Sequence, residues 1–405
     1  MRISTSTFYS ENVSSMSQLQ INIAQTQQQI ATGRRILSPA DDPAGAARAV
    51  ELSMSDSANT QFSFNRTAAI NTLSLSDGFL QSVTSLLQDA QTTVLDATSQ
   101  GSSSANRSAL ATHLKSSLQE LLGLANSTDG TGNYLYAGGQ GGVQPFAISA
   151  GGVVYQGDDV LHKVQAAPSR QIPTSDSGAD IFMRIKNGNG TFQAAPAAAN
   201  TGSGIVSQGV VLDATLYNAN TYQVSFSVAP GGTTYSINDT TSGTPVALAV
   251  PYVSGQAITF NGIQFDIKGA PANGDTFSVS PSGNQSIFDT IDKLITTLTM
   301  PIPAGNSAAL AVYQQGLNNA SAALGRGLDT VLGVRATIGS RLNELDALQL
   351  SGDSMGLQYK QTLSRIQDTD YTKAISDLTQ QNMNLQAAQQ TFAKVANLSL
   401  FSYLN

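Results

Sequence analysis

Apolar residues recur at helical spacing near both ends of the chain. Near the N-terminus the intervals are three, four or seven residues, which predicts a helix with a narrow apolar stripe. Most other residues there are Gln, Asn, Ser and Thr. The last helix has a similar, nearly heptad pattern. The stripes comprise Val13, Met16, Leu19, Ile23 and Ile30 in the first helix, and Ile375, Leu378, Leu385, Phe392 and Val395 in the last.

Helical spacing also continues inward from both ends. A long helix is predicted around residues 75–94, and a shorter one at 113–124 follows the Gly and Ser residues of 101–104. After the middle of the chain, helical spacing returns at residues 287–298 and, beyond the Met-Pro-Ile-Pro break at 300–303, at 310–345. These segments predict helices on both sides of the central region.

The central region, from about residue 128 to 283, has a different pattern. Gly and Pro concentrate there, between short runs of β-branched and aromatic residues at 221–228, 257–267 and 275–281. Such runs, separated by turn residues, predict strands. The Asn261-Gly262 pair between two apolar alternations predicts a tight β-hairpin.

The order of helices, strands and helices predicts a mainly α fold with an inserted β domain. We expect the two helical arms to run antiparallel as a long coiled-coil-like rod built from both termini, with a β-rich outer head. The predicted domains are an inner helical domain (1–40 with 360–405), a helical shaft (41–142 with 283–359) and the outer β-rich domain (143–282).

Composition excludes several classes of function. The chain has 405 residues, of which 40% are hydrophobic, so it can bury cores, but only 12% are charged. A net charge of −7 without basic runs argues against nucleic-acid binding. No apolar run approaches the roughly 20 residues that cross a bilayer, and the N-terminus lacks the pattern of a secretory signal. These rules alone predict a cytoplasmic protein.

The stretch LSPADDPAGAARAVEL (Leu37–Leu52) raises the question of a metal or phosphate site. Adjacent Asp41 and Asp42 have no further acidic residue before Glu51, and Gly45 stands alone. Calcium loops need more oxygen ligands, and phosphate loops need more glycines. Asp42 and Pro43 instead suit an N-cap and a first helical turn, and Pro39 disfavours helix before them. We predict a helix-boundary joint at Pro39, Asp42 and Pro43.

No other residues form a catalytic or ligand-binding pattern. His113 and His162 lie in different predicted regions, and there is no cysteine. Asp368 and Asp370 precede the last helix and suit a helix cap better than an acid/base pair. The Gly-rich stretch 138–142 lacks the Lys-Ser/Thr of a phosphate loop. We therefore predict no enzyme activity and no catalytic, metal or cofactor residues.

Two terminal stretches resemble the flagellin family of bacterial axial proteins. They are TGRRILSPADDPAGAA (Thr32–Ala47) and the segment from IQDTDYTK to SLFSYL (Ile366–Leu404). The two ends of the chain, MRISTSTFY and LSLFSYLN, are similar to those of the family's hook-filament junction subunits. Three segments in the middle are similar to them as well: GNYLYAG (Gly132–Gly138), QPF (Gln144–Phe146) and VYQGDD (Val154–Asp159). This resemblance implies a structural, secreted subunit of the extracellular flagellum. It also implies that the chain is exported unfolded through the flagellar type III channel. The expectation of a cytoplasmic protein is thereby overturned.

The resemblance also implies partners. They are the first hook-associated protein, flagellin, copies of the chain in a ring, and an export chaperone at the C-terminal helix, with no membrane insertion. The apolar stripes of the two terminal helices are the predicted assembly interface. A filament subunit, and a secreted adhesin that works through its β domain, remain alternatives.

Overall fold

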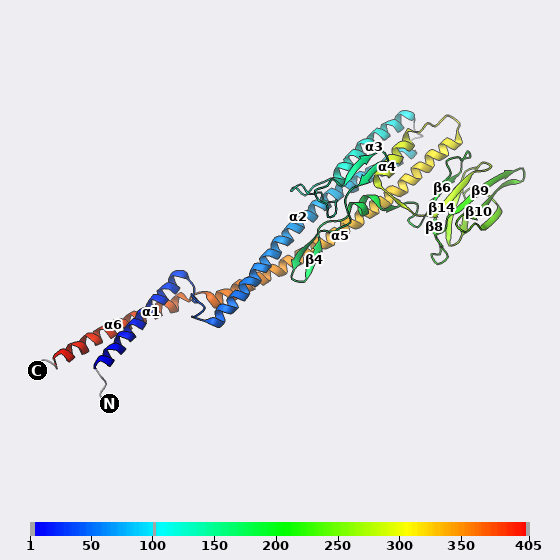
Figure 1. Ribbon diagram of the computed structural model, residues 1–405. Helices are drawn as coiled ribbons and strands as arrows, with labels where there is room; N and C mark the ends of the chain where they lie inside the picture. The colour runs from blue at the N-terminus through cyan, green and yellow to red at the C-terminus, as the bar shows by residue number, and fades with distance from the viewer. Residues whose placement is uncertain (1–4, 100–102, 402–405) are drawn as a thin grey trace. The chain divides into compact units, whose positions relative to one another are not determined.

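The computed structural model describes residues 5–99 and 103–401 and is mainly helical, with a β-rich middle (Figure 1). The chain divides into two compact units, one formed by residues 1–65 with 347–405 and the other by residues 66–346. The predicted fold class is therefore confirmed. The division into three domains remains a prediction.

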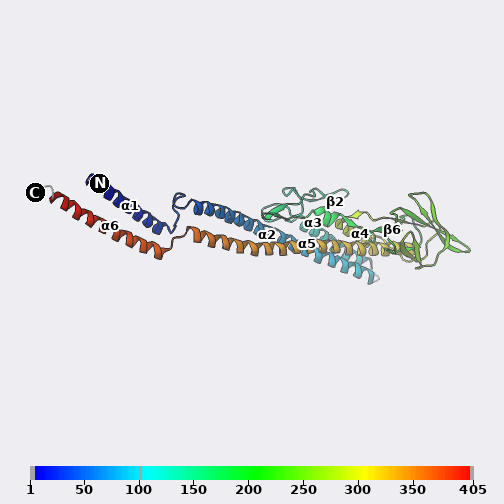
Figure 2. The ribbon, with the colours of Figure 1, turned by 90° about the horizontal axis from the view of Figure 1, so that it is seen from below.

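In the first unit, two terminal helices lie side by side. Helix α1 (Thr5–Thr32) packs against α6 (Tyr371–Phe401), and the start of α1 and the end of α6 lie at the same end of this antiparallel pair (Figures 1 and 2). Gly33, with φ +70°, ends α1 in the left-handed conformation that glycine adopts without steric cost. The unit also holds the first part of α2 (Pro43–Ser99) and the last part of α5 (Ser307–Gln367).

Two short linkers connect these helices, residues 33–42 between α1 and α2 and residues 368–370 between α5 and α6. The helix that follows each linker has an aspartate as its N-cap. The Gly45 N–H donates to Asp42 Oδ1 over 2.9 Å at the start of α2, and the Lys373 N–H donates to Asp370 Oδ1 over 3.2 Å at the start of α6. Both bonds satisfy N–H groups that lack partners within the helix. The sequence predicts this cap chemistry at both places.

The two linkers are also hydrogen-bonded to each other. The Arg35 N–H donates to the Gln367 carbonyl over 2.6 Å, and the Thr369 N–H donates to the Gly33 carbonyl over 2.9 Å. The Arg35 guanidinium reaches the Ile366 carbonyl over 2.9 Å and the Asp42 carboxylate over 3.4 Å. The breaks in the two helical arms therefore coincide and form one joint.

The second unit has a helical core. Helices α3 (Ser104–Ala125) and α4 (Ile287–Thr299) pack together, and the parts of α2 and α5 that belong to this unit run alongside them (Figures 1 and 2). Buried Arg107 donates to the carbonyls of Leu298 and Met300 at the C-terminal end of α4 and lies 5.5 Å from the ring centre of Tyr313. A cation at this end complements the helix dipole. Large apolar side chains fill the core, among them Leu73, Leu80, Leu87, Leu114, Leu121, Ile291 and Leu294.

Two small hairpins pack on these helices. They are β1 (Phe146–Ser149) with β2 (Gly152–Tyr155) and β3 (Lys163–Ala167) with β4 (Arg170–Pro173). Arg170 pairs with Glu344 of α5, and Nη1 and Nη2 of Arg341 donate to the two carboxylate oxygens of Asp176 over 2.9 Å. A π-helix, η1 (Ala179–Met183), follows, and β5 (Ile185–Lys186) pairs with β15 (Asn284–Gln285).

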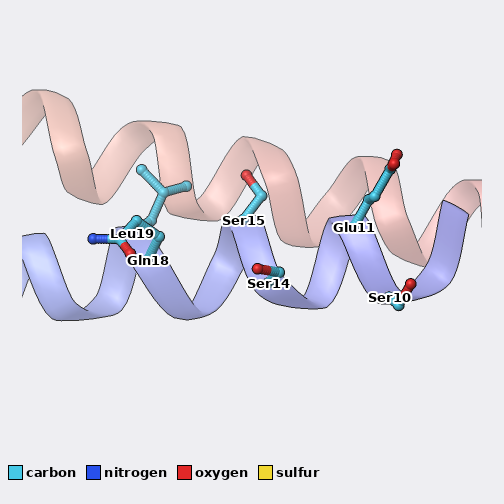
Figure 3. A pocket seen from close by; sticks show the side chains of 6 residues that line it. All are labelled: Ser10, Glu11, Ser14, Ser15, Gln18 and Leu19. Carbon is cyan, nitrogen blue, oxygen red and sulfur yellow. The ribbon is translucent and has the colours of Figure 1, made fainter. Parts of the chain in front are cut away.

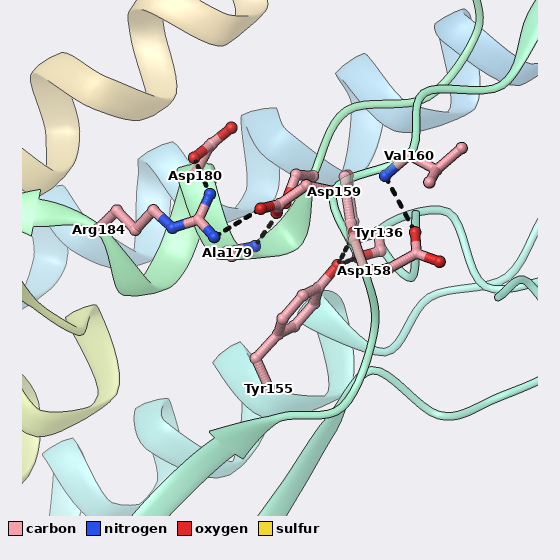
Figure 4. A network of polar contacts seen from close by, with 9 residues as sticks. Tyr136, Tyr155, Asp158, Asp159, Val160, Ala179, Asp180 and Arg184 are labelled. Atoms are coloured by element: carbon pink, nitrogen blue, oxygen red, sulfur yellow. Dashed lines mark hydrogen bonds and ion pairs between the residues drawn. The ribbon is translucent and has the colours of Figure 1, made fainter. Parts of the chain in front are cut away.

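A polar network fixes the segment between β2 and η1 (Figure 4). The Tyr155 hydroxyl oxygen lies 3.0 Å from the Tyr136 carbonyl and 2.8 Å from the Asp158 carbonyl, which share its one proton. Arg184 pairs with both Asp159 and Asp180 over 2.7 Å. Hydrogen bonding to Arg184 lowers the pKa of Asp159 below its ordinary value, and the two carboxylates raise the pKa of Arg184. The network thus ties this segment to Tyr136 and to η1.

The remaining strands form two sheets around one hydrophobic core, which we call the sandwich (residues 192–281). The antiparallel five-stranded sheet has the order β11 (Pro245–Pro251), β10 (Gly232–Asp239), β9 (Tyr222–Ala229), β14 (Thr276–Pro281) and β6 (Phe192–Pro196). The second sheet has the order β12 (Ala257–Phe260), β13 (Ile263–Lys268) and β7 (Ile205–Val206), and β8 (Val210–Val211) also pairs with β13.

Alternation of apolar and polar residues positions the sandwich core. Inward-facing Val224, Phe226, Phe265 and Phe277 are buried in one cluster shared by both sheets. The predicted Asn261-Gly262 hairpin joins β12 to β13, with φ values of 42° and 76°. Two consecutive positive φ angles are typical of the tight turn that this residue pair favours.

Candidate assembly interface

The α1–α6 pair is held by a narrow seam with a near-heptad spacing. Only Ile23, Thr26 and Ala374 are buried among the described side chains of the two helices. The Tyr9 and Phe392 rings meet edge to face with centroids 5.1 Å apart, and the Thr26 hydroxyl donates to Gln381 Oε1 over 3.1 Å. Buried or half-buried positions recur at 9, 12, 16, 19, 23, 26 and 30 in α1 and at 374, 378, 381, 385, 388, 392 and 395 in α6, and positions 22, 25 and 29 of α1 are also half-buried.

This spacing includes most of the predicted stripe residues, but not all of them. Met16, Leu19 and Ile30 are half-buried in α1, as are Leu378, Leu385, Phe392 and Val395 in α6. Val13 and Ile375 lie outside the seam, with 53% and 54% of their surface exposed. Each follows a seam residue by one position, Asn12 or Ala374, and a helix turns by about 100° between neighbours. Apart from Tyr9, the seam positions that sequence reasoning missed are polar or small.

The outer surface of the pair exposes apolar side chains. Ile21, Tyr371 and Met383 are more than half exposed, like Val13 and Ile375. Apolar groups left outside the seam are available to other protein surfaces. The α1–α6 pair therefore offers an internal seam that holds the two helices together and outer apolar side chains that neither helix covers.

A shallow groove along α1 is too open to hold a small molecule. Ser10, Glu11, Ser14, Ser15 and Gln18 line it and are exposed, and only Leu19 is half-buried (Figure 3). Binding sites for small molecules are usually concave and bury most of the ligand. Small hydroxyl side chains instead allow close approach of another helix along this surface.

The helix-boundary joint holds the other predicted site residues. Pro39 and Pro43 are exposed, and Asp42 is half-buried beside Arg35. Asp41 accepts the N–H groups of Leu37 and Ser38 over 3.0 and 2.8 Å. Both carboxylates therefore bond within the joint. Sequence reasoning missed Arg35 and Thr369, whose contacts join the two linkers; the basic pair after Gly33 was the only signal.

The other polar candidates lie apart. His113 Nε2 is 2.7 Å from Asp89 Oδ2 on the surface, whereas His162 lies in the loop before β3. In the Gly-rich stretch, the Gly139 N–H donates to Asp158 rather than pointing into an open cradle. Within residues 5–99 and 103–401, no three His, Asp or Glu side chains are placed to hold a metal ion. No helix in the same ranges is long and apolar enough to span a membrane.

Comparisons with known proteins agree with this architecture. Residues 3–140 match the family model described as the bacterial flagellin N-terminal helical region. The chain is 27% identical to flagellar hook-associated protein 3 of Salmonella typhimurium, covering 99% of both chains. The crystal structure of Xanthomonas campestris FlgL is 31% identical, has a TM-score of 0.67, and is matched over 99% of its length and 76% of this chain.

The chain belongs to the FlgL family of flagellar hook-associated proteins. Another FlgL structure, described as the flagellar junction protein of Legionella pneumophila, is 29% identical with a TM-score of 0.71, over all of that chain and 79% of this one. The predicted membership in the flagellin family, on its junction branch, is confirmed. FlgL relatives are named as hook-associated and junction proteins, that is, as parts of the flagellum rather than as enzymes.

Proposed function

We propose that this chain is a structural subunit that joins the flagellar hook, through the first hook-associated protein, to the flagellin filament. The observation that carries the proposal is the α1–α6 pair, which is built from both ends of the chain and leaves apolar side chains such as Val13 and Ile375 exposed. Full-length similarity to flagellar hook-associated protein 3 supports it.

The seam and the outer surface have different roles in this proposal. Leu19, Ile23, Leu378 and Leu385 hold α1 against α6, and the exposed apolar side chains contact the neighbouring subunits in a ring of copies. The flanks are rich in glutamine and carry few charges, so copies pack without strong like-charge repulsion.

The terminal helices gain much of their order from assembly. A helix pair with three buried side chains among those that the structure describes recovers little of the roughly 1–2 kcal/mol per residue that ordering a backbone costs. Segments with low apolar content commonly fold when they bind. Such termini are compatible with export of the unfolded chain through the flagellar type III channel, with a chaperone at the C-terminal helix, to the extracellular flagellum.

Two experiments separate this function from its alternatives. In flagellated cells that lack their own copy, gold-labelled antibody against the chain should mark one point, where hook and filament meet. Label along the whole filament would identify a filament subunit and refute the proposal.

The second experiment removes the sandwich. Its two ends lie together, because the Asn187 N–H donates to the Gly283 carbonyl and the Ser282 N–H donates to the Thr191 carbonyl. A short Gly-Ser linker can therefore replace residues 190–282. Filaments should remain attached in this variant, whereas removal of residues 366–405 should abolish attachment. If the sandwich alone were required, for adhesion to a surface, the adhesin alternative would be favoured.

A further inference from the structure

The sandwich has almost no charge on its surface. Its 90 residues, 192–281, include only five charged side chains. Asp239 and Asp275 are buried and hydrogen-bonded to backbone N–H groups, and Asp266 is half-buried. The exposed ones are Asp213 and Lys268, one of each sign. Globular surfaces ordinarily carry far more charges, so the positions of these two are informative.

Asp213 lies on an exposed apolar segment, which we call the acidic knob (residues 210–216). Its carboxylate Oδ1 accepts the N–H and the hydroxyl of Thr215 over 2.8 and 2.6 Å. These bonds lower the pKa of Asp213, so the side chain is ionised at neutral pH. Three flanking aliphatic side chains are more than half exposed, namely Val210, Leu212 and Leu216.

The backbone holds the knob in place. The Leu212 and Asp213 N–H groups donate to the Gly262 carbonyl over 2.8 and 3.0 Å. Residue 262 immediately precedes β13, so the knob lies at the start of that strand. The aliphatic side chains and the carboxylate are thus presented on a fixed loop.

Lys268 lies at the other end of β13, beside a cavity of about 490 Å³ that we call the basic cavity. Arg107 also lines it and donates hydrogen bonds to the carbonyls of Leu298 and Met300. None of the lining residues that the structure describes is acidic, and Ile205, Ile302, Leu310 and Leu317 supply apolar surface. The cavity therefore suits a carboxylate flanked by aliphatic side chains.

We propose that the acidic knob of one copy docks in the basic cavity of the next copy. The two sites cannot meet within one chain, because the residues from 263 to 268 separate them by roughly 16 Å at about 3.3 Å per residue. A contact between two different surfaces repeats from copy to copy and closes into a ring when the rotation allows it. The inference rests on the proposed function, in which copies surround one axis.

Neither element of this contact is strong by itself. An exposed ion pair contributes at most about 1 kcal/mol, so Asp213 and Lys268 mainly fix which surfaces meet. Burial of the aliphatic side chains of the knob in the cavity adds a favourable term. We expect the contact to form between copies that the terminal helices already hold together.

Site-directed cross-linking tests the contact. Because the chain has no native cysteine, only the introduced thiols of this protein can react. Ala214→Cys lies on the knob and Gln314→Cys lines the cavity; both positions are exposed, and neither removes a charge. The two variants are expressed together in flagellated cells that lack their own copy. Isolated flagella are then treated with a short bis-maleimide and analysed on a denaturing gel. Ser242→Cys, also exposed on the sandwich, replaces Ala214→Cys in the control.

We expect the 214–314 pair to give at least several-fold more covalent dimer than the 242–314 control. Asp213→Lys or Lys268→Asp, each added to both chains, should reduce the yield several-fold, and both changes together should restore it. Equal yields from test and control pairs, on flagella that contain the chain, would overturn the inference and leave the proposed function standing. Absence of even the wild-type chain from the flagella would instead overturn the proposed function.

Discussion

Leu385→Asp tests the seam between α1 and α6 directly. Leu385 is half-buried in the seam. Burying a whole leucine side chain contributes roughly 1.5–3 kcal/mol, so loss of half of that burial costs about 1 kcal/mol. The poorer helix propensity of aspartate costs roughly 0.5 kcal/mol, and turning the new carboxylate out to water distorts the seam further. The total is about 2 kcal/mol per subunit, or about a 30-fold weaker equilibrium for incorporation.

The matched control is Gln386→Asp, which adds the same charge to the same helix one position away. Gln386 is exposed, so this variant has the propensity cost without the loss of seam burial. Each variant is expressed at a low level in cells without their own copy, and its amount in purified flagella is measured by quantitative immunoblot. We expect at least tenfold less Leu385→Asp than Gln386→Asp. Equal amounts would refute the role of the seam.

Three other measurements test further parts of the account. Gly262→Ala should lower the free energy of unfolding, measured in urea, by about 1–2 kcal/mol. A Cβ at φ 76° is strained and would lie 2.1 Å from the Asp213 carbonyl oxygen. The control Gly231→Ala has open space around the new Cβ and should have little effect. The pKa of Asp159 is below its ordinary value of 3.8 in the folded state. The stabilising contribution of this carboxylate is therefore present above about pH 4 and is lost as the pH falls further. The Asp159→Asn variant should lose less Tm than wild type between pH 5 and pH 3, and equal losses would contradict this reasoning. In the free monomer, amide hydrogens of residues 5–35 and 370–400 should exchange rapidly, and strong protection there would show that the terminal helices do not depend on assembly.

The helices and the sandwich hairpin were predictable because their signals are local. The spacing of Leu378, Leu385 and Phe392 is visible in a single helix, and Asn261-Gly262 specifies its own turn. The predicted stripe nevertheless included Val13 and Ile375, because an apolar residue one position from the seam looks the same in sequence as one inside it. The seam's polar members, Asn12 and Gln381, have no hydrophobic signal.

Contacts between distant residues could not be predicted from one sequence. The bond between Arg35 N–H and the Gln367 carbonyl joins residues 332 positions apart and depends on two helical breaks coinciding. The charges of Asp213 and Lys268 are visible in the sequence, but only the fold places Asp213 near the start of β13, and Lys268 and Arg107 around one cavity. The joint and the cavity are formed by backbone groups and side chains from separate segments of the chain. The spacing of apolar residues along the sequence does not predict such contacts.

The number of copies per flagellum, measured against filament length, distinguishes a junction subunit from a filament subunit. A subunit confined to the junction should be present at the same number on flagella sheared to short lengths, provided the hook remains attached, as on intact ones. Quantitative mass spectrometry of length-fractionated flagella gives this number, with flagellin as the internal measure of length. We predict a constant, small copy number. A copy number that rises in proportion to flagellin would contradict the junction role.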